Sequence, residues 1–282
     1  MGMETAEAEG MEFALEDGAV TLVKGCCPDG EAEIPERVEI GGEELPVSCI
    51  GRGAFEDMPV SCVVLPESVV YIAEGAFCGC SALESVLLPS GLRFVGRRAF
   101  YGCLSLRRLD LPGELECIGE EAFSDCFSLG SARIPDSLDF LGDWAFSGCA
   151  SLAEARVPSG VGTVGKGAFS DCASLMKAEI CEGVAEIDDW AFFKCMSLES
   201  IDLPESVWRI GGGAFSDCIS LSRASIPSGL RSLGGGAFYG IVFLDRDGDA
   251  LEQLPESLCG RSFEGSDCYL RQVRRGFSGS LL

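Results

Sequence analysis

The chain has 282 residues, of which 47% are hydrophobic, so it is long enough to bury a large core and too apolar to be disordered. Its 45 acidic and 21 basic residues give a formal net charge of −24, which argues against nucleic acid and anionic membranes as partners because both need a basic surface. Histidine and asparagine are absent, which excludes imidazole bases, histidine metal ligands and N-glycosylation sites.

The N-terminal segment is the most acidic part of the chain, with 13 acidic residues against Lys24 and Arg37 in residues 1–46. We expect residues 1–10 to be a disordered acidic leader and residues 11–47 to form an N-terminal β cap. Within this cap, residues 12–23 are typical of a hairpin that turns at Asp17-Gly18. Residues 32–35 and 45–47 resemble a degenerate first coil of the repeat that follows.

The first residues contain neither the basic segment nor the apolar segment of a secretory signal. This absence predicts a cytoplasmic location. Removal of a leader from a longer precursor would instead make the protein secreted or exposed at the cell surface. No apolar run is long enough to span a membrane, so we expect no membrane span.

A repeat fills residues 48–240. Its Ala-Phe pairs are separated by 22 residues once and then by 23 residues seven times, and they begin at positions 54, 76, 99, 122, 145, 168, 191, 214 and 237. The whole unit reads L-x-x-ϕ-x-ϕ-P-x-x-ϕ-x-x-ϕ-G-x-x-A-F-x-x-C-x-S, where ϕ is apolar. The alternating start predicts a short strand, which the proline ends, while glycine permits a tight bend. One unit cannot bury its own apolar side, so stacked copies predict a β-rich solenoid.

Residues 241–275 depart from the repeat and predict a C-terminal cap, followed by a tail at residues 276–282. Acidic residues between Asp245 and Glu256 are spaced like those of a calcium loop. Ala250 stands where that loop needs glycine and no helical pattern flanks it, so a hairpin turn at Asp247-Gly248 is favoured.

The L-x-x-ϕ-x-ϕ-P and ϕ-G-x-x-A-F-x-x-C columns resemble the leucine-rich repeats of the BspA-like (Treponema-type) family. The resemblance covers roughly residues 47–240. It implies a leucine-rich-repeat right-handed coil of about nine 22–23-residue repeats with N- and C-terminal caps. It also implies a surface, adhesion or host-interaction role, since most members of the family are described in these terms.

The cysteines favour packing over chemistry. Of the 16 cysteines, seven share one column of the repeat and are predicted to be small buried core residues: Cys80, Cys103, Cys126, Cys149, Cys172, Cys195 and Cys218. Disulfides between stacked layers and a Cys259–Cys268 bridge within the cap remain open alternatives. No set of four ligands with zinc spacing is present, so we expect no metal and no cofactor.

Two surfaces are candidates for partner binding. Alternate residues of each strand point outward, and on the middle coils they form a near-neutral to basic set: Arg108, Asp110, Arg133, Glu154, Arg156, Lys177 and Glu179. The alternative is a solvated sheet whose charges pair across strands. The second candidate is a row of aromatic residues along an edge, which either act as interface anchors or fold over their own coil: Tyr101, Trp144, Trp190, Phe193 and Tyr239.

The sequence therefore predicts a non-enzymatic protein–protein interaction scaffold that binds a protein partner through its stacked strand face. We expect the protein to be a monomer. We also expect no catalytic residues, because the chain has no histidine and no polar cluster outside the repeat. The alternative is an extracellular or cell-surface adhesion or carbohydrate-binding module of a BspA-like protein. The sequence does not identify the partner.

Overall fold

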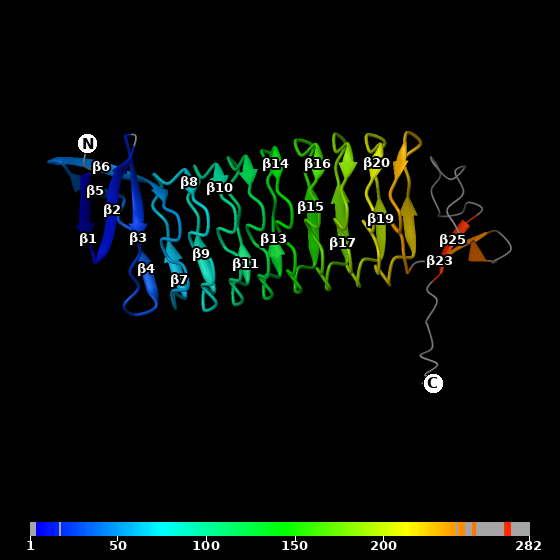
Figure 1. Cartoon of the computed structure of the whole chain (residues 1–282), viewed down its shortest axis with the longest axis horizontal. Helices are drawn as coiled ribbons and strands as arrows, with labels where there is room; N and C mark the ends of the chain where they lie inside the picture. The colour runs from blue at the N-terminus through cyan, green and yellow to red at the C-terminus, as the bar shows by residue number, and fades with distance from the viewer. Residues whose placement is uncertain (1–3, 17, 241, 246–249, 252–267, 272–282) are drawn as a thin grey trace.

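The computed structural model describes residues 4–16, 18–240, 242–245, 250–251 and 268–271, with side chains described up to Gly240. The described residues form strands and turns, without a helix. Successive coils stack side by side along one axis into an elongated solenoid (Figure 1).

The N-terminal end is covered by an antiparallel arrangement of β1 (Glu4–Ala8), β2 (Met11–Glu16) and β3 (Ala19–Lys24). The expected hairpin is the β2–β3 pair. The expectation of disorder over residues 1–10 is wrong for β1, which pairs with β2 along its whole length. The reason is an alternation hidden by the acidic composition, because Ala6 and Ala8 pack against the core while Glu7 between them is exposed.

The first coil lies between this cap and the regular repeat. It contains β4 (Glu31–Glu33), β5 (Arg37–Ile40) and β6 (Glu43–Ile50). The β4 strand pairs in parallel with β7 (Cys62–Val64), and β6 pairs in parallel with both β3 and β8 (Tyr71–Ile72). The cap is therefore continuous with the solenoid through backbone hydrogen bonds.

Each later coil contributes two short strands. The first strand comes from L-x-x-ϕ-x-ϕ, as predicted, and its copies are β7, β9 (Ser85–Leu87), β11 (Arg108–Leu109), β13 (Ser131–Ala132), β15 (Glu154–Val157), β17 (Lys177–Ile180), β19 (Ser200–Asp202) and β21 (Arg223–Ser225). We call the outward surface of these strands the strand face. Copies pair in parallel with a 23-residue offset within three groups, β7–β9, β11–β13 and β15–β17–β19–β21, as in Glu154 opposite Lys177.

The second strand of each coil was not predicted. It comes from the ϕ-x-x-ϕ-G part of the unit, and its copies are β8, β10 (Phe94–Val95), β12 (Cys117–Ile118), β14 (Phe140–Leu141), β16 (Thr163–Val164), β18 (Glu186–Ile187), β20 (Arg209–Ile210) and β22 (Ser232–Leu233). We call the outward surface of these strands the second face. Each copy has only two residues, and the copies pair in parallel between neighbouring coils in two groups, β8–β10–β12–β14 and β16–β18–β20–β22.

The interior is a stack of phenylalanine rings, one for each Ala-Phe pair. Neighbouring ring centroids are 5.0–5.6 Å apart, with planes 1–15° from parallel. This confirms the prediction that the repeated phenylalanine fills the core once per layer. Eight of these rings are fully buried and Phe238, at the last layer, is 6% exposed.

The cysteine column lies beside the phenylalanine stack and is fully buried, as predicted. Each Sγ–H donates a hydrogen bond of 3.0–3.3 Å to the phenylalanine carbonyl oxygen of the preceding coil, as in Cys172 to Phe146. All fourteen cysteines whose side chains the structure describes are free thiols. The thiols therefore connect adjacent layers by hydrogen bonds in place of disulfides.

Two columns owe their residue types to backbone geometry. A Cβ added at Gly142 would lie 2.5 Å from the amide nitrogen of Glu120 in the preceding coil, so this glycine column permits close approach between coils. The aspartates of the repeated AFSDC pentapeptide, Asp125, Asp171 and Asp217, have φ of 58–59°. Aspartate or glycine occupies this position in every coil except one, which has Lys194 with φ of 56°, and both aspartate and glycine tolerate the left-handed region.

Beyond the last coil, β23 (Val242–Asp245) pairs antiparallel with β24 (Ala250–Leu251) and β25 (Cys268–Arg271). The predicted Asp247-Gly248 turn, the other loop residues up to Glu256, the Cys259–Cys268 bridge and the 276–282 tail lie outside the residues or side chains that the structure describes.

Candidate functional site

The strand face brings all seven predicted partner-binding residues onto one surface. Arg108 and Asp110 belong to the β11 segment, Arg133 directly follows β13, and the other four alternate along β15 and β17: Glu154, Arg156, Lys177 and Glu179. Six of the seven are exposed and Arg156 is half-buried. The strand alternation predicted this geometry, because the residues between them point into the core.

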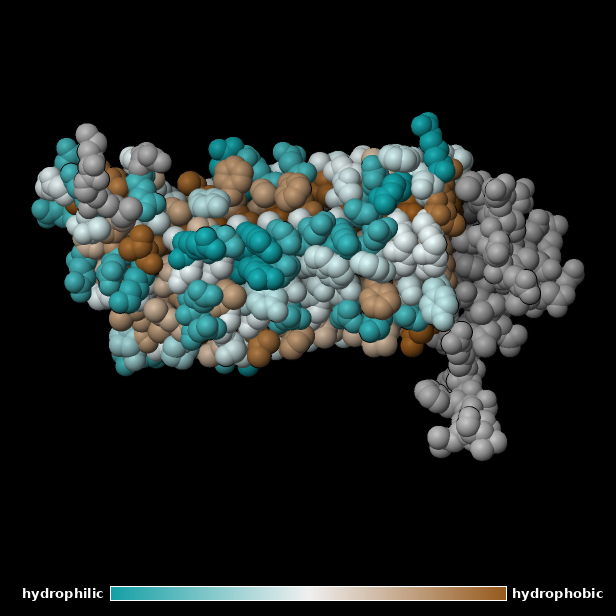
Figure 2. Space-filling view, in the orientation of Figure 1, coloured by the Kyte–Doolittle hydropathy of each residue, from teal (hydrophilic) through white to brown (hydrophobic). Residues whose placement is uncertain are grey.

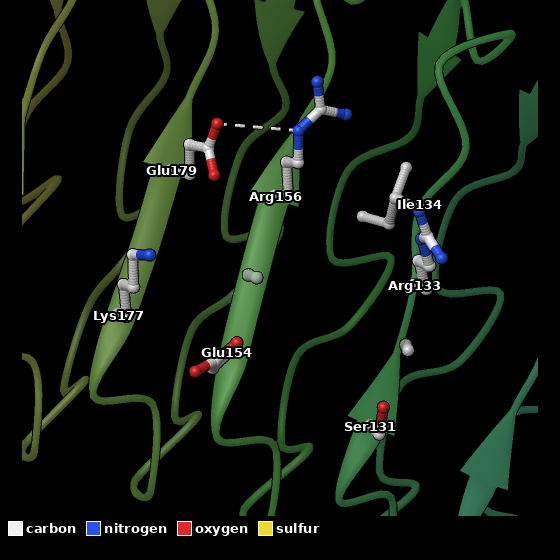
Figure 3. Close-up of a pocket in the computed structure, with 9 residues that line it drawn as sticks. Ser131, Arg133, Ile134, Glu154, Arg156, Lys177 and Glu179 are labelled. Carbon is white, nitrogen blue, oxygen red and sulfur yellow. Dashed lines mark ion pairs between the residues drawn. The ribbon is translucent and has the colours of Figure 1, made fainter.

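The charges of this surface are only partly paired. Arg108 forms an ion pair of 3.0 Å with Asp110 of its own strand segment. Arg156 pairs with Glu179 of the next strand at 3.6 Å (Figure 3) and also donates a hydrogen bond to Asp136, which raises the pKa of the Arg156 guanidinium. The alternative of charges paired across strands therefore describes Arg156 and Glu179.

The remaining three residues make no ion pair with any described residue. Glu154 stands directly opposite Lys177 in the β15–β17 register, yet their charged groups do not meet. Arg133 likewise has no carboxylate within ion-pairing distance among the described residues. In Figure 3, Lys177 lies on β17 and Arg133 lies just beyond the end of β13, on either side of β15.

A hollow of about 330 Å³ lies among these side chains. Its lining comes from β13, β15 and β17: Ser131, Ala132, Arg133, Ile134, Glu154, Ala155, Arg156, Lys177 and Glu179. An adjoining hollow of about 480 Å³ continues from Lys177 over β19 to β21. Buried alanines at positions 132, 155 and 178 lie at the bottom of the two hollows, between the outward side chains.

The predicted aromatic edge folds onto the solenoid. A Cβ added at Gly167 would lie 2.1 Å from the Trp144 ring, and one at Gly213 would lie 2.5 Å from the Trp190 ring. Each tryptophan therefore covers the glycine of the next coil, which explains why tryptophan and glycine alternate at this position. The Lys166 ammonium lies 4.8 Å from the centroid of the Trp190 ring.

The other members of the edge are less connected to one another. The Arg98 guanidinium lies 5.4 Å from the ring centroid of Tyr101, and the Asp125 carboxylate raises the pKa of that tyrosine. Phe193 has the Lys194 ammonium 4.9 Å from its ring centroid. Tyr239, at the last coil, is 56% exposed.

The structure also shows an apolar row on the second face that the sequence analysis missed. It crosses β8, β10, β12 and β14 through Tyr71, Phe94, Cys117 and Phe140, which are paired in register. Three of the four are exposed and Cys117 is half-buried. Figure 2 shows tan and brown atoms along the upper edge of the molecule, where Figure 1 places these strands. In the sequence, the four residues of this row share one position, directly before the second ϕ in ϕ-x-x-ϕ-G, and their apolar character at that position could have revealed the row.

Among the described residues, no group of three or more Cys, Asp or Glu side chains is placed to hold a metal ion. The same part of the chain has no helix with the length and apolarity needed to cross a lipid bilayer.

The chain matches one family model, described as a BspA type leucine rich repeat region, in six copies over residues 48–176 and 141–246. No curated protein matches the chain.

Three solved structures illustrate the likeness. A leucine-rich repeat protein from Bacteroides ovatus is 29% identical, with a TM-score of 0.71 over 85% of this chain and 61% of that one. A leucine rich repeat protein from T. pallidum is 28% identical, with a TM-score of 0.63 over 77% of this chain and 90% of that one. A leucine rich cell surface protein from Faecalibacterium prausnitzii is 26% identical, with a TM-score of 0.60 over 89% of this chain and 61% of that one. The chain thus spans less than two thirds of the length of the first and third.

Proposed function

The chain belongs to the BspA type leucine rich repeat family, and from this premise we propose that it is a non-enzymatic scaffold that binds a protein partner through its strand face. The observation that carries the proposal is the hollowed surface over β13–β21, which is lined by outward charged side chains and by buried alanines beneath them. A recess lined by both apolar and charged groups is typical of a recognition surface.

The interior supports this role. The stacked phenylalanine rings and the thiol–carbonyl hydrogen bonds hold each coil against its neighbours, so the outward side chains start from fixed backbone positions. A surface that is ordered before binding loses less conformational entropy on association than a flexible one.

The location of the protein relative to the cell determines which partners it can meet. The F. prausnitzii relative is described as a cell surface protein, which favours the alternative of a secreted or surface-exposed protein with an adhesion role. The expected cytoplasmic location finds no support among the relatives. We therefore propose that the partner is met outside the cell.

A photo-crosslinking residue tests the choice of surface. We would place benzoylphenylalanine at Ser131, which lines the hollow, and at Thr163, an exposed residue of β16 on the second face. Irradiation in the presence of extracellular and cell-surface protein fractions should give a discrete crosslinked species from position 131 and none from position 163. Crosslinking from position 163 alone, or equally from both, would assign the partner to another surface.

A further inference from the structure

We infer that the partner segment that docks on the strand face is acidic, with two carboxylates that pair with Arg133 and Lys177 in the hollow over β13–β17. This inference rests on the proposed function and adds the chemistry of the partner.

These two cations are exceptional among the basic residues that the structure describes. Up to Gly240, thirteen of the sixteen lysines and arginines form an ion pair or lie over an aromatic ring; the others are Arg133, Lys177 and Arg231. With 45 acidic residues in the chain, a cation without a carboxylate partner is unusual. Two of these three line the same hollow, which leaves two donors on one surface for a ligand.

The hollow also has an excess of positive charge that the described carboxylates do not pair. Its lining has three cations and two carboxylates, a local charge of +1 on a chain of net charge −24. Glu179 is already paired with Arg156, so Glu154 is the one lining carboxylate without an ion pair. A basic segment would find a single acceptor here, whereas an acidic segment finds two free cations.

The placement of the two cations suits an extended segment. Arg133 and Lys177 belong to the β13 and β17 segments, on either side of β15. They are also offset along the strands, because Lys177 begins β17 while Arg133 follows β13. Two carboxylates on one segment that crosses β15 can each meet one of these cations.

The test uses fluorescence anisotropy with the full chain and a labelled (Glu-Gly-Gly)4 peptide, compared with (Gln-Gly-Gly)4 of the same length. We expect the glutamate peptide to bind and the glutamine peptide not to bind. Reversal of both cations, Arg133→Glu with Lys177→Glu, should weaken binding about tenfold or more, since each exposed ion pair contributes modestly. Neutralisation of both to Gln should weaken it less.

Arg231→Glu is the matched control, because Arg231 is also an exposed cation without an ion pair but directly precedes β22. It changes the net charge by the same amount per residue and should alter binding less than twofold. Equal losses in the Arg231 and Arg133 single variants would reduce the effect to overall charge and overturn the inference. Inorganic phosphate and a sulfated heparin fragment serve as competitors, and displacement of the peptide by phosphate alone, or tighter binding of heparin, would also overturn it.

The outcome for the proposed function is read separately. The crosslink from Ser131 reports the proposed function, and it is repeated with the double charge reversal, whose fold is checked by circular dichroism. If the crosslink from Ser131 forms and the double charge reversal leaves it unchanged, the strand face still binds the partner but the partner is not acidic. If no crosslink forms from Ser131 while both cations are intact, the proposed function fails together with the inference.

Discussion

The repeated phenylalanine and cysteine act as a pair at each layer. Phe146 packs between the rings of the adjacent coils, and its carbonyl oxygen accepts the Sγ–H of Cys172. The column pattern predicted that both side chains are buried. The hydrogen bond could not be predicted, because it depends on where the carbonyl of one coil meets the thiol of the next. Cysteine suits this position because it is small and apolar yet still carries a weak donor.

We predict that Phe169→Ala lowers the free energy of unfolding by about 3–5 kcal/mol. The Phe169 ring is fully buried between Phe146 and Phe192, so its loss leaves a cavity that backbone-paired coils cannot close. Urea melts followed by circular dichroism measure the change. A loss below about 1 kcal/mol would show that the ring does not carry the packing of its layer.

We predict that the protein becomes less stable as pH rises above about 8.5, the ordinary pKa of an unfolded thiol. Burial raises the pKa of Cys80 and Cys126 to about 12, so these thiols stay neutral in the folded state while the unfolded chain ionises. The unfolded state therefore binds fewer protons between these values, and each such thiol costs about 1.4 kcal/mol of stability per pH unit.

Urea midpoints at pH 7, 8, 9 and 10 check this dependence. Cys126→Ala is the control, since it removes one titrating thiol and should reduce the slope of stability against pH. A flat profile up to pH 10 would contradict burial of neutral thiols.

The two strands of each coil differ in how far the sequence reveals them. The strands of the strand face have alternating residues, and this pattern predicted both the strands and the seven outward positions. The strands of the second face have two residues each, too few for any periodicity, and they exist because neighbouring coils pair there. The Tyr71–Phe140 row went unnoticed for the same reason.

The hollow of the strand face could not be found from strand alternation alone. Ala132, Ala155 and Ala178 are core residues, and the sides of the hollow are outward side chains whose positions depend on their rotamers. The absence of an ion pair at Arg133 and Lys177 depends on side-chain placement, which strand alternation does not determine.

We predict that the coil is a removable unit. Deletion of residues 115–137, one period of 23, joins Glu114 to Leu138, which occupies the position of Leu115 in the repeat. Because each coil contacts only its neighbours, the shortened chain should still unfold cooperatively, with a slightly smaller denaturant slope. Deletion of residues 115–134 is the control, since it puts Pro135 in the place of Leu115 and shifts every later column. Equal folding of the two chains would mean that the 23-residue register is not what aligns the coils.

At the scale of the whole molecule, ion pairs between coils act against an overall acidic charge. Several of them join residues one period apart, among them Arg97 with Glu120, Arg98 with Glu121, and Arg209 with Glu186. Exposed ion pairs contribute little individually. The net charge of −24 instead destabilises the compact state through self-repulsion over the whole solenoid.

We therefore predict that moderate salt stabilises the protein. Raising the ionic strength from about 0.01 M to about 0.15 M shortens the screening length from about 30 Å to about 8 Å, which weakens repulsion between distant carboxylates more than it weakens adjacent ion pairs. Urea midpoints in sodium chloride should rise over this range. A falling midpoint would mean that the ion pairs between coils outweigh the repulsion.

The alternation of the first strands has a consequence for how such proteins diverge. The side chains that pack one coil on the next point inward, whereas the side chains that would contact a partner point outward. The packing residues and the binding residues are therefore different residues. Mutations can then replace the outward residues one at a time without weakening the packing of the core. Homologues with the same fold are free to acquire unrelated binding specificities. The inward columns identify members of the family but do not indicate what each member binds.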